Sequence, residues 1–421
     1  MQKGSTKALE NLCGVDSLVN IFKDLIAFDT QADPTSKAVP STVGQLRFGA
    51  YLCARLSDLG YEAHQDKNGV VSVEVEPSAG FENKQKICLL AHMDTAPDCS
   101  GANINPHLVE KYQGHGIELN NGLILDDSIC PNLKNHVGED IIVTDGTTLL
   151  GADDKAGIAI LLELLRNLKV NSQLKHGPLK VIFSVDEEIG LSTTHLDVKE
   201  ISCDFGVTVD GTALGELDTA SFNAYGAIVK IKGLSVHTAV AYKTLINAIS
   251  LANDFINMLP RDEKPENTQG LEGFYHVHKF EGTTESAKLN MIIRDFTDEG
   301  MQKRLDLLKS IESIINQKYG DKVCEVKTTF QYANMGNVLK DKQDLVELLK
   351  QAYVDAGVSV IENSVRGGTD GSNLSNNGLP TPNIFTGGLN CHGPFECLPV
   401  KAFNKAYEVV ENIVKLTAAK A

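Results

Sequence analysis

Several short apolar runs of this sequence are followed directly by histidine, aspartate or glutamate side chains. His92 and Asp94 come after the run Ile87–Leu90, and the acidic stretch Asp186–Glu188 comes after Leu179–Val185. Continuous apolar runs of this length are typical of buried strands in an α/β sheet. Because open α/β sheets build their sites at the carboxyl ends of their strands, we expect these polar side chains to meet.

An acidic pair, Asp153 and Asp154, lies on a glycine-flanked turn before a long apolar segment. The run Ile158–Leu165 contains no helix breaker, so a buried helix is predicted to begin near Asp154. Carboxylates are stable at a helix N-terminus, because the free N–H groups and the helix dipole favour negative charge. The pair alone would suit an ordinary helix cap. The other polar clusters favour a metal ligand instead, and we predict that Asp153 bridges two metal ions.

Two further clusters complete the candidate site. Asp210 follows the apolar run Phe205–Val209, and His392 lies in a glycine-rich loop after the short strand predicted at Pro382–Thr386. Two imidazoles and three carboxylates suit zinc and are a poor set for calcium or magnesium. We predict two zinc ions, with cobalt or manganese as alternatives, and two such ions can acidify a water and polarise a carbonyl group. The predicted ligands are His92, Asp153, Glu188, Asp210 and His392.

Two more carboxylates are predicted to act beside the ligands. Asp94 is two residues from His92, so both side chains lie on the same face of the strand. We therefore expect Asp94 to fix the tautomer and orientation of the imidazole. Glu187 is adjacent to the ligand Glu188 and points to a different side, which leaves it available as the general base.

Length, charge and cysteine usage limit the class of protein. A chain of 421 residues usually forms more than one domain. The net charge of −16, from 39 basic and 55 acidic residues, argues against a nucleic-acid or anionic-membrane partner. Nine cysteines without a CxxC pair indicate free thiols in a reducing compartment. With no membrane-spanning apolar run and no leader segment, we expect a cytoplasmic protein.

The pattern of elements predicts an α/β protein of two domains. Residues 1–221 and 335–421 are predicted to form a discontinuous catalytic domain with a mixed, largely parallel sheet flanked by helices. Residues 222–334 follow the order strand, helix, strand, strand, helix, strand, which is a ferredoxin-like βαββαβ series inserted into the first domain. The long stretch Cys99–Thr148, rich in Asn, Asp and Gly, is expected to lie beside the site.

Longer motifs of this chain resemble the peptidase T family. That family comprises tripeptide aminopeptidases and belongs to the co-catalytic zinc exopeptidases, which also include glutamate carboxypeptidases and aminoacylases. The resemblance covers nearly the whole chain, and the motifs DGTTLLGADDKAG and RGGTDG are specific to the family. The segments that carry it are His92–Thr95, Asp145–Gly157, Asp186–Gly190, Thr208–Gly211 and Arg366–Gly371, with Glu272–His276 and Ile292–Phe296 in the inserted domain.

The resemblance implies the same five zinc ligands, with Asp94 as the orienting carboxylate and Glu187 as the base. It also implies a cis peptide bond between Asp153 and Asp154. His237 corresponds to the histidine of the inserted domain that stabilises the tetrahedral intermediate. Thr238 and Ala239 follow this histidine where the family usually has Pro-Gly, so the local turn differs from that of the family.

Arginines are the candidate substrate-binding residues. Arg366 opens the RGGTDG motif, and a fixed arginine near a site of this kind suits a substrate carboxylate, which it can bind through two hydrogen bonds. Arg294, in the inserted domain, is the second candidate for the same role.

The leading hypothesis is a dizinc aminopeptidase that removes the N-terminal residue from tripeptides, with small peptides as its partners. A dipeptidase or a deacylase of N-acyl amino acids would use the same catalytic core and is the nearest alternative. A metal-binding scaffold without catalysis is the alternative from another class, and the intact Glu187 beside Glu188 argues against it. Relatives of this kind often form homodimers through the inserted domain, so a homodimer is a further expectation.

Overall fold

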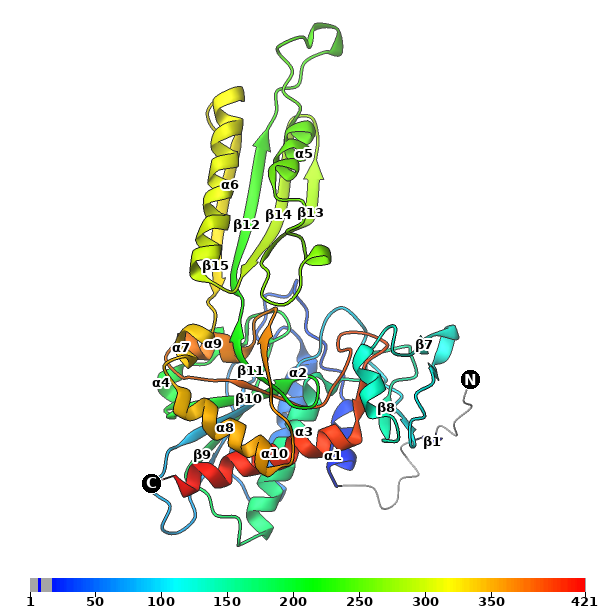
Figure 1. Cartoon of the computed structure of the whole chain (residues 1–421), viewed down its shortest axis with the longest axis vertical. Helices are drawn as coiled ribbons and strands as arrows, with labels where there is room; N and C mark the ends of the chain where they lie inside the picture. Colours follow the sequence, from blue (N-terminus) through cyan, green and yellow to red (C-terminus); the bar gives the residue numbers. More distant parts are fainter. Residues whose placement is uncertain (1–6, 9–16, 421) are drawn as a thin grey trace. The chain divides into compact units, whose positions relative to one another are not determined.

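The computed structural model describes residues 7–8 and 17–420 of the chain (Figure 1). The chain divides into two compact units, which are Met1–Thr219 with Val338–Asn363 and Thr369–Ala421 (unit 1), and Ala220–Asn337 with Ser364–Gly368 (unit 2). Residues 222–334, the predicted insertion, lie inside unit 2. The segment Ser364–Gly368 also belongs to unit 2, whereas the boundaries drawn from the sequence assign it to the catalytic domain.

Unit 1 is built around a mixed sheet of eight strands in the order β16-β11-β17-β10-β4-β9-β3-β2. The four central strands, β17, β10, β4 and β9, run parallel to one another. Strands β2 and β3 form an antiparallel hairpin, and β3 pairs antiparallel with β9. The predicted mixed and largely parallel sheet is therefore confirmed. The strands are β2 Ala63–Gln65, β3 Val71–Val75, β4 Ile87–His92, β9 Leu179–Ser184, β10 Phe205–Gly211, β11 Glu216–Ser221, β16 Ile361–Val365 and β17 Asn383–Phe385.

Helices pack against this sheet, and most of the first half of α3 is buried. Its residues Ala156–Leu165 are buried, as the unbroken apolar run predicts, and it packs against β4 and β10. Helices α1 and α10 pack against α3 in turn, and Phe22 and Phe403 join them at a ring separation of 5.8 Å. The helices are α1 Ser17–Ile26, α2 Val43–Asp58, α3 Ala152–Val170, α4 Val198–Ile201, α7 Gly336–Leu339, α8 Gln343–Asp355, α9 Asp370–Asn376 and α10 Val400–Ala419. Across the described residues, no helix combines the length and apolarity needed to cross a membrane.

A second, smaller sheet holds the long stretch between Cys99 and Thr148. It has the strand order β1-β5-β8-β18, with β1 Lys7–Ala8, β5 His107–Val109, β8 Ile141–Val143 and β18 Cys397–Pro399. A separate hairpin joins β6 Ile117–Glu118 to β7 Ile124–Leu125. Strand β18 begins five residues after His392, and it pairs antiparallel with β8, the strand that precedes α3. The stretch is therefore tied to the segments that carry two predicted ligands.

Unit 2 is the predicted βαββαβ unit. Its antiparallel sheet has the order β13-β14-β12-β15, and helices α5 and α6 share one core with it. Helix α5 begins at Ala248, because the side chain of Asn247 accepts a hydrogen bond from the backbone N–H of Ile249 at 2.9 Å and caps the helix. The elements are β12 Asn223–Lys232, α5 Ala248–Met258, β13 Phe274–Gly282, β14 Ser286–Asp295, α6 Asp298–Tyr319 and β15 Cys324–Tyr332.

Candidate metal centre

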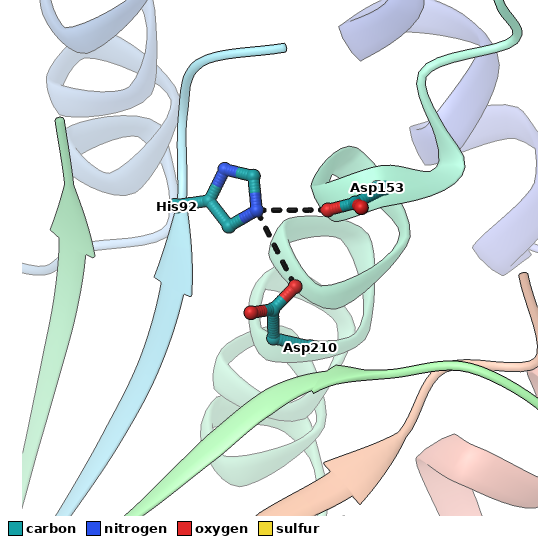
Figure 2. A group of neighbouring side chains, drawn as sticks. All are labelled: His92, Asp153 and Asp210. Carbon is teal, nitrogen blue, oxygen red and sulfur yellow. Dashed lines mark hydrogen bonds and ion pairs between the residues drawn. The ribbon is translucent and has the colours of Figure 1, made fainter. Parts of the chain in front are cut away.

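One histidine and two carboxylates meet at the edge of the main sheet where its parallel strands end. His92 is the last residue of β4, Asp210 lies in the neighbouring strand β10, and Asp153 lies at the start of α3 (Figure 2). The imidazole Nε2 of His92 is 2.8 Å from Oδ1 of Asp153 and 3.3 Å from Oδ1 of Asp210. Parallel pairing of β4 with β10 brings these strand ends to one place, as the sequence pattern predicts.

Asp153 also belongs to a second group. The Nε2 atom of His392 is 3.1 Å from Oδ2 of Asp153 and 3.1 Å from Oε2 of Glu188. Within each group the candidate ligand atoms all lie within 4.8 Å of one another. Because Asp153 directs one oxygen to each group, its carboxylate has the geometry of a bridge between two cations. The structure thus brings all five predicted ligands together.

The electrostatics of the two groups suit divalent cations. Burial raises the pKa of the Asp210 carboxyl to about 7, and it raises the pKa of Glu188 to about 7 as well. Hydrogen bonds to Asp153 and Glu188 raise the pKa of His392 to about 11. The Oε1 atom of Glu188 is buried and has no hydrogen-bond partner within the described residues. Crowded carboxylates and an unpaired buried oxygen fit a bound dication, and the donor set of imidazole and carboxylate fits zinc.

The side chain of Asp94 has a wider role than the sequence predicts. The Nδ1 atom of His92 lies 3.0 Å from the backbone carbonyl oxygen of Asp94 and 3.5 Å from its Oδ1. The two carboxylate oxygens of Asp94 accept hydrogen bonds from the backbone N–H groups of Glu187 and Glu188, each at 3.0 Å. Asp94 therefore orients the imidazole largely through its own carbonyl group, while its carboxylate anchors the acidic turn.

The turn that carries Glu187 is held from its other side by Asp186. This residue has a positive φ of 57°, which is uncommon outside glycine. Its buried carboxylate accepts hydrogen bonds from the hydroxyl of Ser41 at 2.5 Å and from the side-chain amide of Gln45 at 2.7 Å. Burial raises the pKa of Glu187 well above its ordinary value, which suits a carboxylate that takes up a proton. Ser41 and Gln45 lie about 140 residues before Asp186 in the sequence. No pattern in the sequence connects them to the site.

Asp154 links the two ligand-bearing segments of the first group. The peptide bond between Asp153 and Asp154 is cis, as the resemblance implies. The carboxylate of Asp154 accepts hydrogen bonds from the backbone N–H groups of His92 and Gly157, both at 3.1 Å. A Cβ atom at Gly157 would lie 2.0 Å from the carbonyl oxygen of Val209, so only glycine allows α3 to approach β10 this closely.

Two buried carboxylates close to the site have no role assigned from the sequence. Asp370 accepts hydrogen bonds from the hydroxyls of Ser184, at 2.8 Å, and Ser192. Glu396 accepts hydrogen bonds from backbone N–H groups of the turn that leads to Asp153. Glu396 stands only four residues after His392 in the sequence, and this proximity is the one signal that points to it.

His237 is exposed and belongs to unit 2. Its Nδ1 atom accepts a hydrogen bond from the backbone N–H of Ala239 at 3.2 Å and caps the short turn Thr238–Val240. The ring proton of the neutral imidazole must then be on Nε2, which is left as a donor. Thr238 and Ala239 thus form a turn that fixes the histidine tautomer.

Arg366 and Arg294 also belong to unit 2, and their guanidinium groups are engaged there. Arg366 donates from Nη1 to the carbonyl oxygens of Gly270, at 2.7 Å, and Glu272, at 2.9 Å, and from Nη2 to the hydroxyl of Thr268 at 2.8 Å. Within the described residues, these bonds leave the Nε–H group and one Nη2–H group of Arg366 for other acceptors. The Nη1 group of Arg294 donates to Oε1 of Gln331 at 3.0 Å, to the carbonyl oxygen of Tyr225 in β12 at 3.3 Å and to that of Ile293 in its own strand β14 at 2.9 Å.

Comparison with known proteins identifies the family. The model of peptidase family M20/M25/M40 matches residues 145–416. A peptidase T from Clostridium perfringens is 42% identical over 95% of this chain and 98% of its own length. The chain belongs to the peptidase T members of this family. The crystal structure of aminopeptidase PepT from Bacillus cereus has a TM-score of 0.74 and 25% identity, and the match covers 96% of this chain and 98% of that one. A tripeptidase from Staphylococcus aureus, with a TM-score of 0.74 over the same shares of the two chains, is 22% identical and bears on the fold alone.

Membership in this family confirms the predicted enzyme class, a metallo-aminopeptidase. It also confirms the resemblance on which several residue roles rest. The α/β fold predicted from the sequence agrees with the fold of the solved relatives. The family therefore supplies the type of reaction, and the geometry described above supplies the residues that are candidates to carry it out.

Proposed function

We propose that this chain is a dizinc aminopeptidase that hydrolyses the first peptide bond of tripeptides. The observation that carries the proposal is the shared carboxylate of Asp153, whose two oxygens face two separate groups of histidine and carboxylate. One zinc ion would be held by His92, Asp153 and Asp210, and the other by Asp153, Glu188 and His392. When bound, the two ions would acidify a water and polarise the substrate carbonyl group.

The general base in this proposal is Glu187. Its carboxylate receives the proton of the attacking water and passes it to the leaving amine, in keeping with the direction in which burial moves its pKa. The hydrogen bonds made by Asp94 and Asp186 hold the backbone of the turn on which Glu187 lies, so the base starts from a fixed backbone position.

His237 is proposed to donate a hydrogen bond from Nε2 to the developing oxyanion. Two points support this role: the resemblance to the family, and the tautomer set by the bond from Ala239 to Nδ1. A fall in turnover number for His237→Ala with little change in KM would support the assignment, and an unchanged turnover number would reject it.

The tripeptide preference is the finer part of the proposal, and a dipeptidase or a deacylase is its alternative. Support comes from the peptidase T relatives, which are 42% identical to this chain over 95% of its length. The test compares hydrolysis of a tripeptide, its N-terminal dipeptide and an N-acetyl amino acid by the zinc-loaded enzyme. Preferred turnover of the dipeptide or of the acyl amino acid would overturn the tripeptidase proposal while leaving the metal centre intact. A homodimer formed through unit 2 also remains a proposal, which sedimentation analysis would test.

A further inference from the structure

Glu396 is a buried carboxylate, 1% exposed, immediately before strand β18. Its Oε2 atom accepts hydrogen bonds from the backbone N–H groups of Leu150, at 2.6 Å, and Gly151, at 2.8 Å. Its Oε1 atom accepts a third hydrogen bond, from the backbone N–H of Asp153 at 3.1 Å. Both oxygens are thus bonded to the turn that presents the bridging carboxylate.

The third of these bonds caps helix α3, which has no side-chain cap of its own, and the other two hold the turn before it. The N-cap residue of α3 is Gly151, which has no side chain to accept a hydrogen bond and has a positive φ of 78°. The first N–H groups of a helix need acceptors from outside the helix, and a carboxylate is favoured there by the helix dipole. Glu396 supplies that carboxylate from a position 243 residues away in the sequence.

The chain that carries Glu396 is itself fixed at both ends. Leu389 and Cys397 exchange two backbone hydrogen bonds, of 2.8 and 3.0 Å, which close the loop that contains His392. Beyond that loop, Cys397 and Leu398 pair with Val143 and Ile142 of strand β8. One closed loop therefore carries a zinc ligand, His392, and the carboxylate that holds the backbone of the shared ligand.

We propose that Glu396 is a positioning residue of the metal centre, which fixes the backbone of Asp153 and thereby sets the affinity for both metal ions. The proposal rests on the dizinc function proposed above. It differs from the roles of Asp94 and Asp186, which hold the turn of Glu187 and Glu188. Because Asp153 faces both groups, a loss of its support weakens both sites together, whereas a loss of support at a terminal ligand weakens one.

The test measures zinc retention by the holoenzyme. Wild type and Glu396→Gln are dialysed against buffers of graded free zinc concentration, and zinc per chain is determined by elemental analysis. In the variant one oxygen becomes an NH2 group, so one or more of the three backbone N–H groups faces a donor instead of an acceptor. The expected result is a fall in affinity of about 10- to 100-fold for both zinc ions, the range found when residues behind metal ligands are changed.

Two further variants separate positioning from charge and from general stability. Glu396→Asp keeps the negative charge, but its side chain is one methylene shorter, so the carboxylate lies farther from the backbone N–H groups. This variant is therefore expected to lose zinc as Glu396→Gln does. Asp295→Asn is the matched control in unit 2, because Asp295 is also a buried carboxylate that accepts a backbone N–H, from Thr297 at 2.9 Å. It should unfold at a lower temperature than wild type yet keep native zinc affinity.

Several outcomes would overturn the inference. Native zinc affinity in both folded Glu396 variants, or loss of only one zinc ion, would contradict it. Failure of both variants to fold even in saturating zinc would make Glu396 a residue of the fold and not of the metal centre. If wild type itself bound fewer than two zinc ions, the proposed dizinc function would fail instead, and the two failures are therefore distinguishable.

Discussion

The carboxylate of Asp94 accepts a hydrogen bond from the backbone N–H of Glu187 at 3.0 Å, so the segment that carries the ligand His92 is connected directly to the predicted base. Its other oxygen accepts from Glu188 at the same distance. Asp94→Asn would present an NH2 group to one of these two N–H donors and displace the turn. We expect zinc affinity to fall by about 10- to 100-fold, together with a lower turnover number in saturating zinc. A native zinc affinity together with a native turnover number would show that the Asp94 carboxylate does not position the turn of Glu187 and Glu188.

Glu187→Gln should abolish most of the activity and leave the zinc content close to that of wild type. The substitution removes the group that takes up the proton but removes no ligand, and the loss of a general base costs about 10²- to 10⁴-fold or more in rate. Turnover by the zinc-loaded variant and zinc per chain are the two measurements. A zinc-replete variant with near-native turnover would require another base.

Arg366→Ala should remove the discrimination between a free C-terminal carboxylate and an amide. With wild type, a C-terminally amidated tripeptide is expected to lose a large part of kcat/KM, because breaking a hydrogen-bonded charge pair costs about 2–5 kcal/mol. Arg366 also holds the segment at Gly270 and Glu272, so the ratio of the two substrates is compared within each variant, which cancels any loss of folded enzyme. An amidation penalty that persists in Arg366→Ala but vanishes in Arg294→Ala would transfer the role to Arg294.

The sequence predicts the parts of the fold that repeat a strong local pattern. The strands that end at His92 and Asp210 are continuous apolar runs, and their parallel pairing follows from the α/β order of elements. Strands β5 and β18 have three residues each, too short for an apolar period to be visible, so the smaller sheet is not predictable. The start of α5 at Ala248 depends on one side-chain cap, that of Asn247.

The sequence reveals which residues have side chains that can bind a metal. It does not reveal which residues position those side chains through hydrogen bonds. His392 and Glu188 stand in recognisable motifs, and the structure places them 3.1 Å apart. Ser41 is an ordinary polar residue in the sequence, and only the tertiary fold reveals that it bonds to Asp186. The assignment of Ser364–Gly368 to unit 2 likewise depends on contacts, such as those of Arg366, that no local pattern records.

Asp218 should make the stability of the enzyme depend on pH. This residue of β11 is buried, and burial raises its pKa to about 7, against about 4 in an unfolded chain. The folded state therefore holds the proton more tightly, so the stabilisation is fully present below about pH 4 and is lost as the pH rises to about 7. Between pH 4 and 8 wild type should lose roughly 2–4 kcal/mol of unfolding free energy relative to Asp218→Asn. Parallel stability curves for the two proteins in urea would contradict the assignment.

The zinc content of Asp153→Ala shows whether one carboxylate serves two metal ions. Zinc per chain is measured by elemental analysis for wild type, Asp153→Ala and Asp210→Ala, the last of which removes a ligand of one group only. We expect two zinc ions in wild type, loss of both in Asp153→Ala, and retention of one in Asp210→Ala. A single zinc ion in wild type, or two zinc ions retained by Asp153→Ala, would contradict it.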